Sequence, residues 1–163
     1  MAPTISSEIV TESECSRIIS KRLMREEIIE FRILTWNVTP LSVIGGFTGQ
    51  YFALNVTVSL ENGSSRKFKF FLKCPPPNDT VYGTFVRENG NFDKEVYIYN
   101  NIFPRLLVDF DRFIVPECYL AVLDRVIVLD DLMDEDFVML DKMIPVEMHH
   151  CRLVLSALAK FHA

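Results

Sequence analysis

Cysteine is scarce in this sequence and long apolar runs are missing, and each absence narrows the range of protein classes. The four cysteines are scattered, with no Cys-x-x-Cys pair and no histidine at metal-ligand spacing: Cys15, Cys74, Cys118 and Cys151. This pattern argues against a disulfide framework and a zinc site, so we expect free, buried thiols and no metal ligands. No window approaches the roughly 20 apolar residues of a membrane-spanning helix.

Basic residues are also in deficit. Lys and Arg total 17 against 22 Asp and Glu, which gives a net charge of -5 and a pI near 5.2. General binders of nucleic acid or of anionic membranes carry the opposite balance, so we expect neither partner. Residues 1–10 lack both the basic segment and the apolar core of a secretory signal, which predicts a cytoplasmic protein.

The residues that are present predict a folded chain. Hydrophobic residues make up 49% of the 163 positions and include 13 Phe, which excludes disorder and favours one compact unit or one lobe of a larger fold. A capping box from Thr11 to Glu14 begins a predicted helix over residues 12–31. Its apolar residues follow at helical spacing: Cys15, Ile18, Ile19 and Leu23.

A hairpin of two strands is predicted next. After a loop over residues 37–47, residues 52–60 alternate between apolar and polar side chains, the pattern of a half-buried strand. Residues 61–64 contain Asn-Gly, which is typical of a tight turn, and residues 67–73 return as the second strand.

The second strand of this hairpin turns one lysine away from its most apolar face. Phe68, Phe70 and Leu72 share a face, so Lys73 points to the other side of the sheet. Three prolines then end the strand, because proline cannot donate to the ladder, and a polar loop is predicted to about residue 90.

Beyond this loop, the spacing of the apolar residues changes from that of a strand to that of a helix. Residues 91–107 form one apolar stripe, and the helix is predicted to end or kink near Pro104. Strands over residues 118–123 and 126–129 follow, and a last helix is predicted from near Pro145. This order of elements is that of a kinase N-terminal lobe: an α+β fold with an antiparallel sheet and a C-type helix, here with an added N-terminal helix and the first helix of a C-lobe.

Glycines before the first predicted strand are candidates for phosphate binding. Gly45, Gly46 and Gly49 lack side chains, which would let backbone N–H groups approach phosphate oxygens. An ordinary turn is the alternative.

Lys73 and Glu95 are the strongest pair of candidates. Lys73 at a strand end could neutralise nucleotide phosphates if an acid held its flexible stem. Glu95 lies three residues after Phe92, on the apolar side of its helix, where an unpaired carboxylate would be costly. We expect the two to pair. The alternative is that Glu95 reaches water at the edge of the stripe or pairs with Lys94.

Asp130, Asp131 and Leu132 follow the last predicted strand, where a kinase hinge would present backbone groups to an adenine edge. A helix cap or a solvated turn is the alternative. Hydrolytic chemistry has no support, because His149 and His150 lack the spacing of a zinc-protease helix and no Gly-x-Ser-x-Gly motif occurs.

Five segments in order resemble the insect ecdysteroid kinase-like proteins, also described as choline kinase-like (CHK) domains and related to aminoglycoside phosphotransferases. They are Gly46-Phe47-Thr48-Gly49-Gln50-Tyr51, Phe71-Leu72-Lys73-Cys74-Pro75, Phe92-Asp93-Lys94-Glu95-Val96-Tyr97-Ile98-Tyr99, Val128-Leu129-Asp130-Asp131-Leu132 and Leu158-Ala159-Lys160-Phe161-His162-Ala163. The resemblance covers most of the chain. Gln50 and Asp130 depart from it, since the family has Asn and Glu there.

The resemblance implies a kinase that uses ATP and magnesium to phosphorylate a hydroxyl of a small lipophilic alcohol. In that case Gly46, Gly49 and Gln50 cover the phosphates and Lys73 contacts them. Glu95 orients Lys73, and residues 130–132 abut adenine.

One requirement of phosphoryl transfer is missing. The 163 residues contain no His-x-Asp catalytic loop and no downstream Asp to hold magnesium. The last predicted helix also runs to Ala163 without a cap or polar tail. We therefore predict a truncated kinase-like chain, a pseudokinase that is inactive alone, with no catalytic residues and no metal ligands of its own.

The predicted organisation is an N-terminal helical segment over residues 1–36, a kinase-like N-lobe over 37–132 and the start of a truncated C-lobe over 133–163. Three alternatives stay open for the function. The lobe could be a non-catalytic module that binds a protein through its exposed surface, or an active kinase when a missing C-lobe completes it. Independently of the family, it could be a small α+β ligand-binding protein in which Lys73 and Glu95 are only structural.

Overall fold

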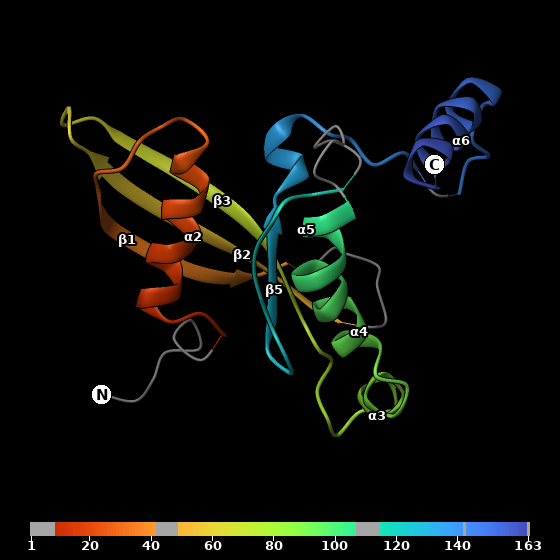
Figure 1. Cartoon of the computed structure of the whole chain (residues 1–163). Coiled ribbons are helices and arrows are strands. Elements are labelled where there is room, and N and C mark those ends of the chain that lie inside the picture. Colours follow the sequence, from red (N-terminus) through yellow and green to blue (C-terminus); the bar gives the residue numbers. More distant parts are fainter. Residues whose placement is uncertain (1–8, 42–48, 107–114, 142, 163) are drawn as a thin grey trace.

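The computed structural model describes residues 9–41, 49–106, 115–141 and 143–162. Five strands form one antiparallel sheet in the order β1-β2-β3-β5-β4, with helices on both faces (Figure 1). The strands are β1 (Phe31–Pro40), β2 (Gln50–Leu60), β3 (Ser65–Cys74), β4 (Cys118–Val122) and β5 (Val126–Asp130). The helices are α2 (Glu12–Met24), α3 (Val81–Glu88), α4 (Asn91–Tyr97), the π-helical η1 (Ile98–Ile102), α5 (Phe103–Leu106), the 3-10 helix η2 (Leu132–Glu135) and α6 (Met148–His162).

Helix α2 begins as predicted but ends earlier. The Glu14 N–H donates to the Thr11 hydroxyl at 3.3 Å, and the Glu14 carboxylate accepts the Thr11 N–H at 2.9 Å, so the capping box is confirmed. The predicted end at residue 31 is wrong, because the helix stops at Met24 and Glu27 adopts a left-handed φ of 58°. The chain then turns back toward the sheet.

Strand β1 was not predicted, and it occupies residues assigned to the end of the helix and to the loop over 37–47. It pairs with β2 along its length, from Phe31 opposite Leu60 to Pro40 opposite Phe52. A register shift between Ile33 and Thr35 interrupts the alternation of side chains, so the strand carries no clean period of two. Strand β1 also runs across the boundary between residues 36 and 37, where the N-terminal helical segment was predicted to meet the N-lobe. The predicted division of the chain into three segments stays a prediction.

Two apolar clusters lie on opposite faces of the sheet. On one face, α2 buries Ile18, Ile19 and Leu23 against Leu54, Val56, Val58, Phe70, Leu72 and Val128. On the other face, α4 buries Phe92 and Val96 against Ile127 and Leu129. Because consecutive strand residues point to opposite faces, β5 supplies Val128 to the first cluster and Leu129 to the second.

The predicted helix over residues 91–107 is present up to Leu106 and does not break at Pro104. It widens into the π-helical η1 directly before α5, where the Phe103 N–H donates to the Ile98 carbonyl. A wider turn accommodates a proline that cannot donate, which explains why the helix continues.

Helix α3 lies where a polar loop was predicted. The Thr80 hydroxyl caps it by accepting the Gly83 N–H at 2.9 Å. Gly83 is required here, because a β-carbon would lie 1.9 Å from the Pro77 carbonyl oxygen. The cap and this close approach are local, and Val86 packs the helix into the α4 cluster; the polar composition of the segment reveals none of these contacts.

Helix α6 begins at Met148, three residues after Pro145, and none of its residues is buried. It lies to the side of the sheet in Figure 1, and the Phe161 ring meets the Phe103 ring edge-on at 6.2 Å. Among the described residues, no helix is long and apolar enough to cross a membrane. The predicted fold class is confirmed: α+β, with the sheet and helices of a kinase-like N-lobe.

Candidate functional site

Lys73 and Glu95 form the ion pair that the sequence predicts. The Lys73 Nζ donates to the Glu95 Oε2 at 2.5 Å, with 19% of the Lys73 side chain and 30% of the Glu95 side chain exposed. Lys73 is near the end of β3 and shares its face with Phe71, which packs against the α4 cluster. Glu95 comes from α4 itself, so the helix that covers this face also positions the lysine.

Gly49 lies against the Lys73 side chain. A β-carbon at Gly49 would be 3.4 Å from both Cγ and Cε of Lys73 and 3.0 Å from the Cys74 carbonyl oxygen. The absence of a side chain therefore lets the backbone before β2 approach the lysine closely. Gln50 follows, opposite Cys74 in the β2–β3 ladder. Gly46, and the neighbouring Gly45, lie outside the described residues.

An aromatic pair shares the face of Lys73, and the sequence analysis did not single it out. Tyr51 and Phe71 stack with ring centroids 5.6 Å apart and an interplanar angle of 27°. Tyr51 is opposite Lys73 in the ladder. The alternation of β3 already places Phe71 with Lys73, away from Phe70, so the signal was present in the strand pattern.

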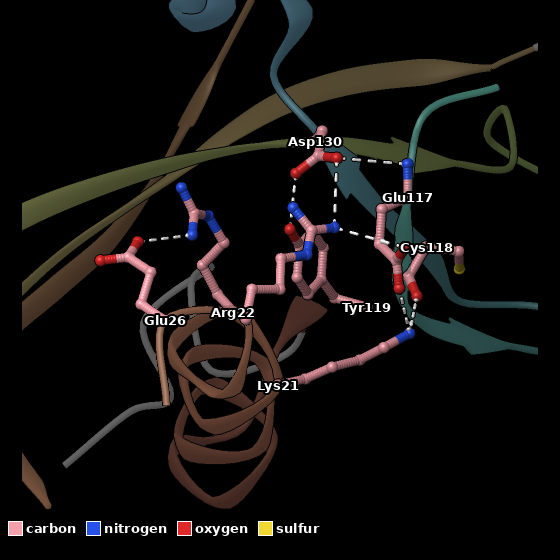
Figure 2. Close-up of polar contacts among 8 residues, drawn as sticks. Lys21, Arg22, Glu26, Glu117, Cys118, Tyr119 and Asp130 are labelled. Atoms are coloured by element: carbon pink, nitrogen blue, oxygen red, sulfur yellow. Dashed lines mark hydrogen bonds and ion pairs between the residues drawn. The ribbon is translucent and has the colours of Figure 1, made fainter. Parts of the chain in front are cut away.

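Asp130 points to the opposite face, toward α2. Its Oδ1 accepts the Tyr119 hydroxyl at 2.6 Å, and its Oδ2 accepts the Glu117 N–H at 3.2 Å and pairs with Arg25 at 3.5 Å. Figure 2 shows this cluster between the end of α2 and strand β4. The hydrogen bond and burial together raise the pKa of Tyr119, burial having the larger effect.

Asp131 directly follows β5 and is buried, with 8% of its surface exposed. Its Oδ2 pairs with the Lys69 Nζ at 2.8 Å, and its Oδ1 accepts the Met133 N–H at 3.1 Å and caps η2. Leu132 begins η2, and its carbonyl accepts the Phe137 N–H at 3.0 Å. Both aspartates therefore have partners within the chain.

The predicted site residues fall into two groups. Gly49, Lys73 and Glu95 converge on one face of the sheet at the β2–β3 end, whereas residues 130–132 lie at the end of β5, which pairs with β3. Asp130 is directed away from Lys73 to the α2 face, because it follows Val126 and Val128 in the strand alternation.

The donors of the first group suit an anion. The Lys73 ammonium, which has three N–H donors, is held near the end of β3, and the backbone at Gly49 lies beside it. An anion could therefore accept hydrogen bonds from the ammonium and from backbone N–H groups. The described residues contain no group of three or more His, Cys, Asp or Glu side chains that could hold a metal ion.

A pocket of about 410 Å³ lies beyond the end of β3. It is lined by Pro75, Pro76 and Pro77, by Gly83, Val86 and Arg87 of α3, and by Phe92 and Asp93 of α4, among others. Its lining does not include Lys73 or Glu95, so this hollow and the ion pair are separate features.

Comparison with known proteins points to one family. Residues 44–163 match the model of the ecdysteroid kinase-like family, which covers more than half of the chain. No curated protein and no solved structure matches the chain. The matched range contains all five segments on which the resemblance rests.

Proposed function

Because this chain belongs to the ecdysteroid kinase-like family, we propose that it is a nucleotide-binding lobe related to small-molecule kinases. In this proposal ATP places its phosphates at Lys73 and its adenine against the backbone of residues 130–132. The acceptor in the complete reaction is the hydroxyl of a small molecule, which the family relationship suggests.

The ion pair between Lys73 and Glu95 is the observation that carries the proposal. The lysine side chain is a flexible four-carbon stem, and ordering it costs conformational entropy. A partner that binds the ammonium offsets this cost. Glu95 supplies that partner at 2.5 Å from α4, while Gly49 leaves room beside the stem. The same combination of lysine, helix glutamate and glycine loop positions nucleotide phosphates in kinase folds.

Phosphoryl transfer needs a further group that orients the acceptor hydroxyl. In kinase folds this is the aspartate of a catalytic loop, and metal-binding residues accompany it. The sequence has no His-x-Asp segment. We therefore propose that these 163 residues bind nucleotide and do not by themselves transfer phosphate to an alcohol.

A thermal-melt titration tests nucleotide binding. A ligand that binds only the folded state raises the melting temperature by mass action, so ATP with Mg²⁺ should give a saturable increase. Lys73→Ala should abolish the increase. Lys67→Ala is the matched control, because it removes an exposed lysine from the same strand and should keep it.

A cooperative melt that ATP does not shift would overturn the proposal. It would also favour a second candidate function, binding of a partner protein through α6. That helix leaves large apolar side chains exposed, including Leu153, Val154, Leu155 and Leu158, and such surfaces mark interaction sites.

A further inference from the structure

Polar contacts on both faces of the sheet hold the end of β5. The proposed contacts with the nucleotide do not involve them. From these contacts we infer that Asp130 and Asp131 are positioning residues, which fix the backbone of residues 130–133 where the nucleobase would lie, and that Arg25 makes helix α2 part of this clamp. The inference rests on the proposed function.

The α2 side of the clamp consists of three contacts to one carboxylate. Asp130 accepts from the Tyr119 hydroxyl and the Glu117 N–H and pairs with Arg25, and only 14% of its side chain is exposed. The Arg25 guanidinium also lies over the Tyr119 ring, 5.1 Å from its centroid, and pairs with Glu117 at 3.3 Å. The last residue of β5 is thereby tied to β4 and to the end of α2.

Lys21 strengthens the same junction one turn earlier in α2. Its Nζ donates to the Cys118 carbonyl at 2.5 Å and pairs with Glu117 at 2.8 Å, as Figure 2 shows. Lys21 of α2 and Arg25 at its C-cap therefore hold Glu117, directly before β4, and the Glu117 N–H in turn donates to Asp130.

The α4 side of the clamp uses the next residue. Asp131 pairs with Lys69 of β3 and caps the first turn of η2 through the Met133 N–H. Because consecutive residues of a strand point to opposite faces, the two aspartates pin the backbone between them from both sides.

Charge balance favours positioning over direct contact with the ligand. Each aspartate already has a cationic partner, Arg25 for Asp130 and Lys69 for Asp131. Breaking such a pair leaves a part-buried charge uncompensated, which is expensive. Their side chains therefore hold the segment, and recognition of a base edge is left to backbone groups.

Separate probes for the two halves of ATP test this assignment. Calorimetric titrations of the full chain with adenosine and with tripolyphosphate report the base and phosphate contacts independently. Arg25→Met and Asp130→Asn should weaken adenosine about tenfold, the worth of one hydrogen bond, and leave tripolyphosphate unchanged. Lys73→Ala should do the reverse.

Arg22→Met is the matched control. Arg22 lies in the last turn of α2, and its ion pair is with Glu26 at 2.9 Å rather than with Asp130 or Glu117 (Figure 2). It should leave the affinity for adenosine at the wild-type value. Arg25→Lys, which keeps the charge, should recover part of the affinity that Arg25→Met loses.

Three results would overturn the inference. The first is adenosine affinity in Arg25→Met equal to that of Arg22→Met, and the second is an equal loss for adenosine and tripolyphosphate, which would indicate general loosening of the fold. Arg25→Met keeps the Tyr119 and Glu117 contacts of Asp130, so it decides the matter if Asp130→Asn does not fold. The third, a wild-type chain that binds neither probe nor ATP, would remove the proposed function as well.

Discussion

Glu14 joins the first turn of α2 to the turn between β4 and β5, and its removal should destabilise the fold in a pH-dependent way. Its carboxylate accepts the Thr11 N–H at 2.9 Å and an Arg125 N–H at 2.9 Å, and it pairs with the second terminal nitrogen of Arg125. The Glu14 side chain is 12% exposed and that of Arg125 is 31% exposed.

The size of the effect follows from the pKa of Glu14. The hydrogen bond from Arg125 lowers this pKa from 4.5 to about 2, against the opposing effect of burial. A lowered pKa means that the carboxylate stabilises the folded state above about pH 4.5, and that this contribution is lost as the pH falls toward 2. One pKa unit corresponds to about 1.4 kcal/mol. Water screens the part-exposed Arg125, so we expect about 1–2 kcal/mol.

Urea unfolding of wild type and Glu14→Gln should show this difference at pH 7. A chain of this length should also lose about 2–4 °C in melting temperature for each kcal/mol. The gap between the two proteins should shrink as the pH falls from about 4.5 to about 3, because Glu14 of the unfolded wild type then binds a proton while the folded state, with its lower pKa, does not.

Glu12→Gln is the matched control for this experiment. Glu12 is an exposed acid in the same helical turn, so its substitution changes the interaction with the helix dipole but not the contact with Arg125. A loss of stability that is equal for the two variants, or one that does not change between pH 7 and about 3, would refute the reasoning.

Two further predictions concern packing and thiol chemistry. Gly83→Ala should destabilise the chain by about 1–3 kcal/mol, since its β-carbon would collide with the Pro77 carbonyl, whereas Thr84→Ala at an exposed position of the same helix should change stability little in the same melt. Burial raises the pKa of the Cys15 and Cys74 thiols to about 12, so neither should react with a disulfide reagent near pH 8 until denaturant is added. Rapid labelling of Cys74 in the folded chain would contradict its burial.

Several elements could be predicted because their signals are local. The capping box begins α2 at Glu12 through contacts within four residues, and alternation alone defines β2 and β3. The pairing of Lys73 with Glu95 was also accessible, since the period of a strand and the period of a helix each place one charge on a definite face. The family resemblance drawn from short motifs is confirmed by the match over residues 44–163.

Other features depended on contacts between distant parts of the chain. Strand β1 exists through its ladder with β2, and its bulge hides the alternation that would have revealed it. Helix α3 was missed for another reason: its cap at Thr80 and the approach of Gly83 to Pro77 are local contacts, but the polar composition of the segment indicates a loop.

The sequence by itself determined the order of most elements, the family and the lysine–glutamate pair, because periodicity and motifs act within short windows. Only the tertiary structure decided what the two adjacent aspartates do. In the sequence they are equivalent acids after a strand, yet one faces Arg25, 105 residues away, and the other faces Lys69 across the sheet. Consecutive side chains of a strand point to opposite faces of the sheet, and the tertiary fold decides which residues they contact on each face.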